Sequence, residues 1–516
     1  MTKTIVVGLD GANWDLIEPW LESDELPNIE KLRDGGCFFD SISCLPTVTF
    51  PNWKCYSTGK NPGKLGVYWF EGVDVGNREL TRPDSNSFKS AEYWDYLDKE
   101  GIRTGVLNMP TTYPPKEVDG FMVCGGPDAK EGESRHLSSG YTYPEELEEY
   151  LEDEWSYRIH PSPLLSSQKE RGEEVEAILD LIEKRFDVAM DLLEKEDVDF
   201  LHLTVFYLNV LQHFFWRDKP TKRAWKLIDK KLGELLERYE DINLVLMSDH
   251  GCGKIDTQFF INRWLEQNNY LKTKKSIDDF FKKIGLTREN ALKIAKKLNL
   301  VDFLAKNVPD RIQRLIPMEE GAIRERKLEK IDWKETDAIA SGQGPIYLTK
   351  KGREKKEEIK KELKKLKSSL TDEKIAKDVH EASEIYHGDE LDKAPDLIVE
   401  ERPGVTISDR VGEGEVFKSP GKWSTENTRK GLALFYGQEC SNETERDEVS
   451  ILDLAPTILN LLGVKIPNDV DGEVIKEIFE EGKEIEYQKP IEDKGEKTLS
   501  EEEEIASRLQ SLGYMD

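Results

Sequence analysis

The stretch Ile242-Asn-Leu-Val-Leu-Met-Ser-Asp-His-Gly251 joins an almost continuous apolar run to a short polar sequence that ends in glycine. Such a run is typical of a strand that is buried on both faces of a sheet. Ile5-Val-Val-Gly-Leu-Asp10 has the same form near the N-terminus. The carboxyl ends of parallel strands face the crevice where α/β proteins bind ligands. The two stretches therefore predict an α/β fold with Asp10, Asp249 and His250 at its ligand-binding edge.

Further apolar runs continue the same alternation of strands and helices. Buried strands are predicted at 104–107, 199–206, 395–399 and 432–436, and helices at 14–21, 27–32 and 173–194. Strands of this kind, separated by helices, indicate a mostly parallel central sheet with helices on both faces.

Two segments interrupt or follow this alternation. Residues 272–330 are Lys-rich, helical in pattern and without strand signals, so we expect a helical cap inserted into an α/β core of residues 1–271 and 331–481. Residues 482–516 include the run Glu501–Glu504 and are predicted to form an acidic C-terminal tail.

Composition excludes several classes of partner. The 516 residues include 74 Lys and Arg against 103 Asp and Glu, a net charge of −29. That balance argues against binding of a nucleic-acid polymer or an anionic membrane surface. No stretch approaches the roughly 18 apolar residues of a membrane span, and no signal-peptide pattern opens the chain. The six cysteines form no CxxC pair, so we expect a cytoplasmic protein with reduced thiols.

A threonine between the two acidic strand ends could be a nucleophile. Leu45-Pro-Thr-Val-Thr-Phe-Pro-Asn52 should stay extended ahead of Pro51, with a helix starting close to Thr49. A hydroxyl at a helix N-terminus near metal-binding carboxylates can be deprotonated to attack phosphorus, while the helix start stabilises the phosphoryl group. The alternative is an N-cap threonine without a catalytic role.

Four motifs resemble those of a known family, in the same order along the chain. They are Asp10, Thr49-Phe-Pro-Asn52, Ser57-Thr-Gly59 and Ser248-Asp-His-Gly251. The chain resembles the alkaline phosphatase superfamily, and most of all its type I phosphodiesterase/nucleotide pyrophosphatase branch. Similarities at Asn108-Met-Pro-Thr-Thr-Tyr-Pro-Pro115, Gln212-His-Phe-Phe-Trp216 and Ile451-Leu-Asp-Leu-Ala-Pro-Thr457 extend the match over most of the chain. The resemblance implies an alkaline-phosphatase-like fold and a metal-dependent hydrolase of small phosphate esters, either diesters or monoesters and including nucleotide types.

The resemblance also implies metal ligands. One divalent ion would be bound by Asp10, Thr49, Asp249 and His250. A second ion in this family takes an Asp and a His four residues apart, together with a later His. Here the matching positions are Asn209, His213 and Asn427, so two of the three ligands are amides.

These replacements predict one strong and one weakened metal site. Amide oxygen is a poor donor to zinc and suits magnesium, manganese or calcium better. We expect zinc first at the strong site, with magnesium, manganese or calcium as alternatives. Three outcomes fit the sequence: a one-metal hydrolase, a hydrolase with a loosely held second metal, and a catalytically inactive protein that only binds its ligand.

Residue roles complete the hypothesis. Thr49 would form a phosphothreonine or nucleotidyl-threonine intermediate that water then opens. Asn52 would bind substrate, and Lys422 or Arg429 could balance charge as cationic side chains do in the related one-metal sulfatases. A sulfatase itself is disfavoured, because Thr49 cannot be converted to formylglycine, and a phosphomutase would be expected to keep both metal sites. The sequence does not predict the oligomeric state.

Overall fold

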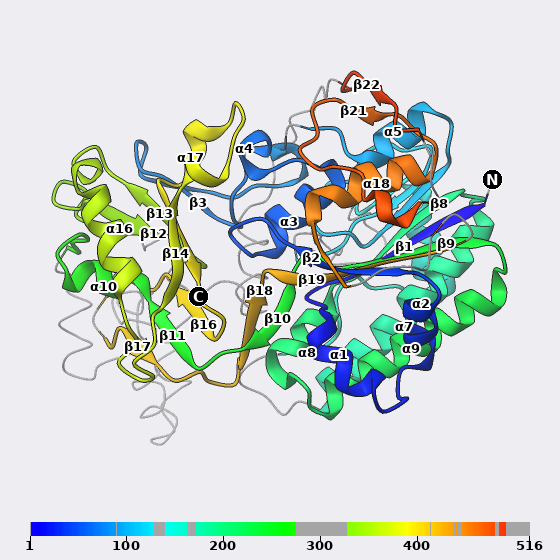
Figure 1. The fold of residues 1–516 in the computed structure, drawn as a ribbon, viewed down its shortest axis with the longest axis horizontal. Coiled ribbons are helices and arrows are strands. Elements are labelled where there is room, and N and C mark those ends of the chain that lie inside the picture. The colour runs from blue at the N-terminus through cyan, green and yellow to red at the C-terminus, as the bar shows by residue number, and fades with distance from the viewer. Residues whose placement is uncertain are drawn as a thin grey trace, which may run out of the picture.

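A computed structural model of the chain describes residues 2–88, 90–127, 140–163, 165, 172–274, 328–412, 414–437, 440, 446–479 and 484–491. Figure 1 shows a larger lobe built around a long sheet and a smaller lobe of short strands. The predicted cap at 272–330 and the predicted tail at 482–516 lie for the most part outside the described residues, so both remain predictions.

The larger lobe contains a nine-stranded sheet of order β20-β2-β19-β9-β1-β8-β5-β6-β7. Strands β9, β1, β8, β5 and β6 run parallel, whereas β19 is antiparallel to both of its neighbours and β7 is antiparallel to β6. The predicted α/β fold with a mostly parallel sheet is confirmed. In sheet order the strands span Glu448–Ser450, Cys37–Ile42, Lys430–Tyr436, Ile242–Met247, Lys3–Leu9, Phe200–Val205, Thr104–Leu107, Gly120–Val123 and Thr142–Tyr143.

Helices cover both faces of this sheet, as Figure 1 shows. One face carries α1 (Trp14–Leu21), α2 (Pro27–Asp34), α7 (Gly172–Lys195), α8 (Tyr207–Phe215) and α9 (Lys219–Arg238). The other carries α3 (Thr49–Thr58), α5 (Tyr93–Lys99) and α18 (Leu454–Leu461). The long helices α7 and α9 are amphipathic, whereas every residue of α3 and α18 is buried. In α9, for example, Trp225, Ile228 and Leu232 recur at helical spacing and are buried.

The smaller lobe has its own hydrophobic cluster and mostly antiparallel pairing. Its four-stranded sheet has the order β12 (Ala338–Ala340), β13 (Pro345–Leu348), β15 (Leu397–Glu401) and β14 (Ala376–Glu381), and α16 (Lys356–Lys365) packs on it. The run at 395–399 thus forms a strand, but not in the parallel sheet for which it was expected. It pairs with β13 on one side and β14 on the other, so both of its edges are occupied within the smaller lobe.

A short antiparallel ribbon lies between the lobes in Figure 1. It pairs β10 (Gly251–Lys254) with β18 (Thr425–Thr428), so that Cys252 lies opposite Asn427. Strand β10 directly follows the carboxyl end of β9, and α8 packs against the ribbon. The ribbon therefore brings residues near 427 to the ligand-binding edge of the large sheet.

The remaining elements are short. They are α4 (Pro62–Leu65), α6 (Glu146–Trp155), α10 (Ile261–Gln267), α17 (Ala382–Ile385), β3 (Gly72–Asp74), β4 (Glu79–Thr81), β11 (Thr257–Phe260), β16 (Val405–Ser408), β17 (Phe417–Lys418), β21 (Ile466–Pro467) and β22 (Tyr487–Gln488). Among the helices that the structure describes, none is long and apolar enough to cross a bilayer.

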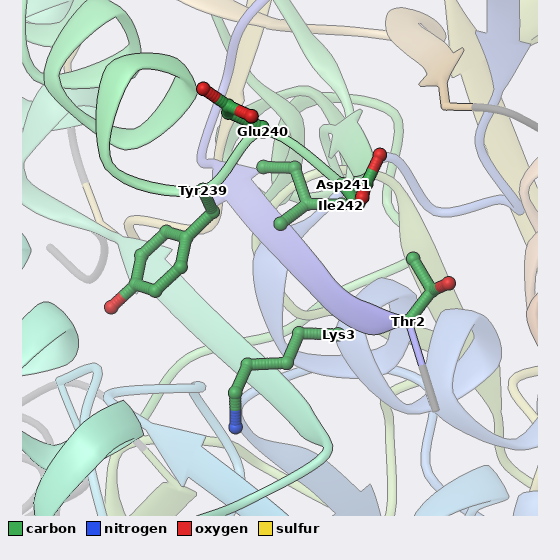
Figure 2. A pocket seen from close by; sticks show the side chains of 6 residues that line it. All are labelled: Thr2, Lys3, Tyr239, Glu240, Asp241 and Ile242. Atoms are coloured by element: carbon green, nitrogen blue, oxygen red, sulfur yellow. The ribbon is translucent and has the colours of Figure 1, made fainter.

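A surface hollow lies at the amino ends of β1 and β9 (Figure 2). Its lining comprises Thr2, Lys3, Tyr239, Glu240, Asp241 and Ile242. Asp10 and Asp249 follow the opposite, carboxyl ends of the same two strands. The hollow is therefore separate from the edge where parallel sheets bind ligands.

Candidate active site

The parallel pairing of β1 with β9 brings the two acidic strand ends together. Gly8 pairs with Met247. Asp10 lies two residues after Gly8 and Asp249 two residues after Met247, so both acids lie at the carboxyl edge of the sheet. Gly11 then turns the chain with φ +70°, a left-handed conformation that suits glycine. A Cβ at Gly11 would lie 2.2 Å from Asn209 Oδ1, so glycine is also needed for this close approach.

Thr49 opens helix α3. Val48 is the extended N-cap and the helix begins at Thr49, so the last extended residue lies three positions before Pro51. Pro51 is tolerated there because the first-turn N–H groups of a helix have no intrahelical acceptor. Asn52 holds the preceding loop: its Nδ2 donates to the Val48 carbonyl at 2.9 Å, and its Oδ1 accepts from the Cys44 N–H at 2.8 Å. These bonds assign Asn52 to the loop, and its contact with substrate remains a prediction.

Four potential ligand atoms, His250 Nε2 among them, gather at the strand ends. Thr49 Oγ1 and Asp249 Oδ2 each lie 3.1 Å from His250 Nε2, and Asp10 Oδ1 lies 3.9 Å from it. In a tetrahedral site with bonds of about 2.0–2.2 Å, neighbouring ligand atoms are about 3.3–3.6 Å apart. The distances from His250 Nε2 fall on either side of this range, and the ligand atoms of Asp10, Asp249 and His250 lie within 4.8 Å of one another, so these three side chains could hold one metal ion.

The hydrogen bonds around these side chains leave the ligand atoms available. His250 Nδ1 faces the Gly251 carbonyl at 2.9 Å, so Nδ1 donates there and Nε2 keeps its lone pair. Trp53 Nε1 donates to Asp10 Oδ2 at 3.0 Å. Within the described part of the chain, no hydrogen-bond partner reaches Asp10 Oδ1 or Asp249 Oδ2. Buried carboxylate oxygens without partners fit a cation.

Burial determines the electrostatics of this group. The side chains of Asp10, Asp249 and His250 have no exposed surface. Burial raises the pKa of Asp10 to about 8, against bonds from Trp53 and Asn209 that lower it. Burial, and then the charge of Asp10, raise the pKa of Asp249 well above its ordinary value, whereas burial lowers the pKa of His250 to about 4. Two adjacent buried carboxylates are costly to ionise unless a positive ion lies between them.

The three predicted ligands of the second metal gather beside the first group. His213 Nδ1 faces the Thr425 carbonyl at 3.0 Å, and its ring stacks on Trp423 with centroids 3.8 Å apart. Asn427 Nδ2 donates to the Thr47 carbonyl at 3.3 Å. Asn209 forms a hydrogen bond with Asp10, which lowers the pKa of that carboxyl. An amide can donate this bond and an ionised carboxylate cannot, so Asn209 supports Asp10 in a way that aspartate would not.

The two predicted cationic residues lie at the edge of this group. Arg429 Nε and Nη2 donate to the Ser43 carbonyl at 3.2 and 3.1 Å, and Nη1 lies 3.3 Å from Glu400 Oε1. Its guanidinium is therefore engaged by groups outside the ligand set. Lys422 is exposed, in the loop that precedes β18.

Two residues near Asp10 were not anticipated from the sequence. Trp53 donates to Asp10 Oδ2, and Gln212 Nε2 donates to the Gly11 carbonyl at 2.8 Å. Trp53 follows Thr49 by four residues and so lies on the same face of α3, and Gln212 directly precedes His213. The i, i+4 spacing from Thr49 was a signal that could have identified Trp53.

Comparisons with known proteins bear on the family and the fold of the chain. The sequence model of the type I phosphodiesterase/nucleotide pyrophosphatase family matches residues 4–429. A direct comparison with curated proteins finds no match. Among solved structures, phosphonoacetate hydrolase from Sinorhizobium meliloti 1021 in complex with phosphonoacetate has a TM-score of 0.54 at 13% identity, covering 88% of this chain and 94% of the hydrolase. Murine ectonucleotide pyrophosphatase/phosphodiesterase 5 has a TM-score of 0.48 at 14% identity, covering 91% of this chain and 97% of that protein.

The hydrolase structure is a likeness of fold alone, because its identity to this chain is low. The family match covers most of the sequence and includes the strand ends at Asp10 and Asp249 as well as Thr49. The chain therefore belongs to the type I phosphodiesterase/nucleotide pyrophosphatase family, whose members are phosphoric ester hydrolases.

Proposed function

We propose that the chain hydrolyses phosphate esters of small molecules, diesters or monoesters and including nucleotides, with Thr49 as the nucleophile. One observation supports this proposal above the others: Thr49 Oγ1 lies 3.1 Å from His250 Nε2 at the first turn of α3. A hydroxyl in that place faces both the acidic group and the N–H groups of a helix start.

A divalent cation fits the group formed by Asp10, Thr49, Asp249 and His250. Zinc is the first expectation, because the compact spacing and the imidazole suit a tetrahedral ion, and magnesium, manganese or calcium are alternatives. The bound cation would supply positive charge that lowers the pKa of the threonine hydroxyl and neutralises phosphoryl oxygens.

Thr49 and the start of α3 have separate roles in the reaction. Thr49 Oγ attacks phosphorus, the bond from phosphorus to the leaving oxygen breaks, and a phosphothreonine or nucleotidyl-threonine forms. The first N–H groups of α3 donate to the phosphoryl oxygens, which carry most of the negative charge. Water then cleaves the bond from phosphorus to Thr49 Oγ and regenerates the hydroxyl.

The alternative is a member of the family that binds its ligand without turnover. The feature that favours it is the amide of Asn209, which supports Asp10 where family members have a second-metal carboxylate. A weakened second site removes charge that would stabilise the leaving group. The cytoplasmic location and a small phosphoester as the only partner class also remain predictions.

Turnover by Thr49→Ala and Thr47→Ala tests the proposal. Both threonines are buried in the same loop–helix segment, which makes Thr47 a matched control. We expect zinc-loaded wild type and Thr47→Ala to hydrolyse bis(4-nitrophenyl) phosphate or 4-nitrophenyl phosphate. At saturating zinc, Thr49→Ala should lose the rate while its metal-free form keeps the wild-type melting temperature. Turnover by Thr49→Ala would exclude Thr49 as nucleophile. Ligand binding without any turnover by the wild type would favour the alternative.

A further inference from the structure

We propose that Arg185 binds a second anionic group of the substrate, a carboxylate or a phosphate separated from the scissile phosphorus by a spacer. The inference deepens the proposed function, on which it rests for the reaction itself. The binding of the anion can be measured without turnover.

Arg185 is a fully buried cation with too few acceptors. Its side chain, in the middle of α7, has no exposed surface. Nη2 donates to the Ile159 carbonyl at 2.7 Å. Across the residues that the structure describes, Nε and Nη1 have no hydrogen-bond acceptor. A buried guanidinium held by one neutral carbonyl is far from electrostatic balance.

In the described part of the chain, the Arg185 guanidinium lies over an aromatic ring. The guanidinium carbon lies 5.6 Å from the centre of the Tyr207 ring, and the Tyr207 hydroxyl lies 2.6 Å from His160 Nδ1. The buried carboxylate of Glu174 is also on α7, but eleven residues away and so about 16 Å along the helix axis. That distance prevents a direct ion pair.

The chemistry of the group selects the ligand. A planar guanidinium matches the two oxygens of a carboxylate or phosphate in a bidentate contact. Tyr207 adds an aromatic face, and its hydroxyl lies within hydrogen-bond distance of His160 Nδ1. The group is suited to the anionic end of a small molecule and offers nothing to a cation.

The location of the group links it to the active site. Tyr207 is the first residue of α8 and follows β8 at its carboxyl end, where Val205 pairs with Leu9, the neighbour of Asp10. Arg185 thus lies at the same edge of the sheet as Thr49 and Asp249. From the strand spacing and the lengths of the side chains, the Arg185 guanidinium is no more than about 20 Å from Asp10. A substrate that spans both groups carries its second anion several bonds from the scissile ester.

Calorimetry with non-hydrolysable ligands tests the subsite. The probes are hexylphosphonate, which has one anionic end, and two analogues with a second one, 6-phosphonohexanoate and hexane-1,6-diphosphonate. Propyl to octyl spacers extend each set. We expect zinc-loaded wild type to bind at least one two-ended analogue roughly tenfold or more tightly than hexylphosphonate, with an optimum spacer length. The better of the two analogues identifies the anion as carboxylate or phosphate.

Substitution of Arg185 supplies the control. Arg185→Met should abolish the preference for two-ended ligands, leave hexylphosphonate affinity unchanged, and keep or raise the melting temperature, because an unpaired buried charge is removed. Arg185→Lys should retain part of the preference. Arg223→Met, at a half-exposed arginine paired with Glu176 on the surface, should change neither affinity.

Several outcomes would overturn the subsite. They are no preference in the wild type at any spacer length, a preference that survives Arg185→Met, and failure of Arg185→Met to fold. The last would indicate that the guanidinium is structural. If the preference is present but no phosphate ester is turned over, the proposed function fails and the subsite stands. If esters are turned over and the preference is absent, the subsite fails and the proposed function stands.

Discussion

At the scale of single residues, the site depends on which atom of each side chain is already occupied. His250 Nδ1 donates to the Gly251 carbonyl, and Trp53 Nε1 donates to Asp10 Oδ2. The opposite atoms are left to face the site: His250 Nε2 lies near Thr49 Oγ1 and Asp249 Oδ2, and Asp10 Oδ1 lies 3.9 Å from His250 Nε2. Partners of this kind orient a ligand, although they never touch the ion.

Trp53→Phe isolates the bond to Asp10, because it removes the indole N–H and keeps an aromatic ring. We expect zinc affinity to fall roughly 10- to 100-fold, the usual effect of losing such a partner. A competing-chelator titration measures it. Trp14→Phe is the control, since Trp14 Nε1 donates to the Phe39 carbonyl at 2.8 Å, outside the ligand set. Equal loss in both variants would argue against a specific role for Trp53.

Gly11→Ala tests the turn that follows Asp10. The change forces a side chain into a left-handed conformation and places its Cβ 2.2 Å from Asn209 Oδ1. We expect a loss of about 2 kcal/mol or more in unfolding free energy, together with weaker zinc binding. Gly101→Ala is the matched control, because Gly101 has φ +74° and a Cβ there meets nothing within 4 Å. Denaturant unfolding should show only the smaller, strain-related loss for Gly101→Ala.

At the scale of elements, the site is assembled where α8, α3 and the β10–β18 ribbon meet the ends of β1 and β9. Asn209 and His213 come from α8, and Asn427 comes from β18. The register of the ribbon puts Asn427 opposite Cys252, two residues after His250. Helix α8 packs on the same ribbon, so the second group of ligands depends on three elements holding their places.

The second metal site is tested by placing a carboxylate at position 209 on α8 and an imidazole at position 427 on β18. Asn209→Asp with Asn427→His should raise occupancy of a second metal, measured by elemental analysis, and should raise the phosphodiesterase rate if the protein is a weakened two-metal enzyme. Without metal the double variant should be less stable than wild type, because the new carboxylate would repel Asp10, whereas the amide of Asn209 donates a hydrogen bond to it.

The sign of the rate change separates the three hypotheses. A weakened two-metal enzyme gains activity. A one-metal enzyme that uses Lys422 or Arg429 as its cationic substitute loses activity, because the added ion repels that group. A pure binder shows no turnover before or after the change.

At the scale of the whole molecule, the buried charges couple folding to pH and to metal. Asp10 has a pKa of about 8 in the fold and an ordinary value of 3.8, so between these values only the folded state holds its proton. Stability of the metal-free protein therefore falls as pH rises through this window. Asp249, whose pKa is also raised, acts in the same direction. The pKa of His250 is lowered from 6.5 to about 4, so this group makes stability rise with pH, but only below pH 6.5.

Between pH 6.5 and 8 the carboxylates thus determine the slope, and the melting temperature of the metal-free protein should fall. Zinc requires deprotonated ligands, so its stabilising effect should grow over the same range. Calorimetric melting with and without a chelator at the two pH values measures the difference. A metal-free melting temperature that stays constant or rises would contradict the pKa shift of Asp10.

Much of the fold and the first metal group could be predicted from the sequence. The strands at 104–107 and 242–247 and the helix at 14–21 have the predicted bounds. Buried parallel strands are continuously apolar, so their ends, and with them Asp10, Asp249 and His250, are visible in local sequence. Thr49 was visible for a related reason, because prolines and the helix start mark its segment.

What only the tertiary structure decided are partnerships between residues far apart in the chain. Apolar periodicity indicates that Leu397–Glu401 is a buried strand, but not that it pairs in the smaller lobe. Likewise the bonds that Trp53 and Asn209 make to Asp10, and the burial of Arg185 over Tyr207, depend on packing. The pattern of a sequence encodes whether a side chain is buried. Which other side chain it meets is determined by sheet register and helix packing.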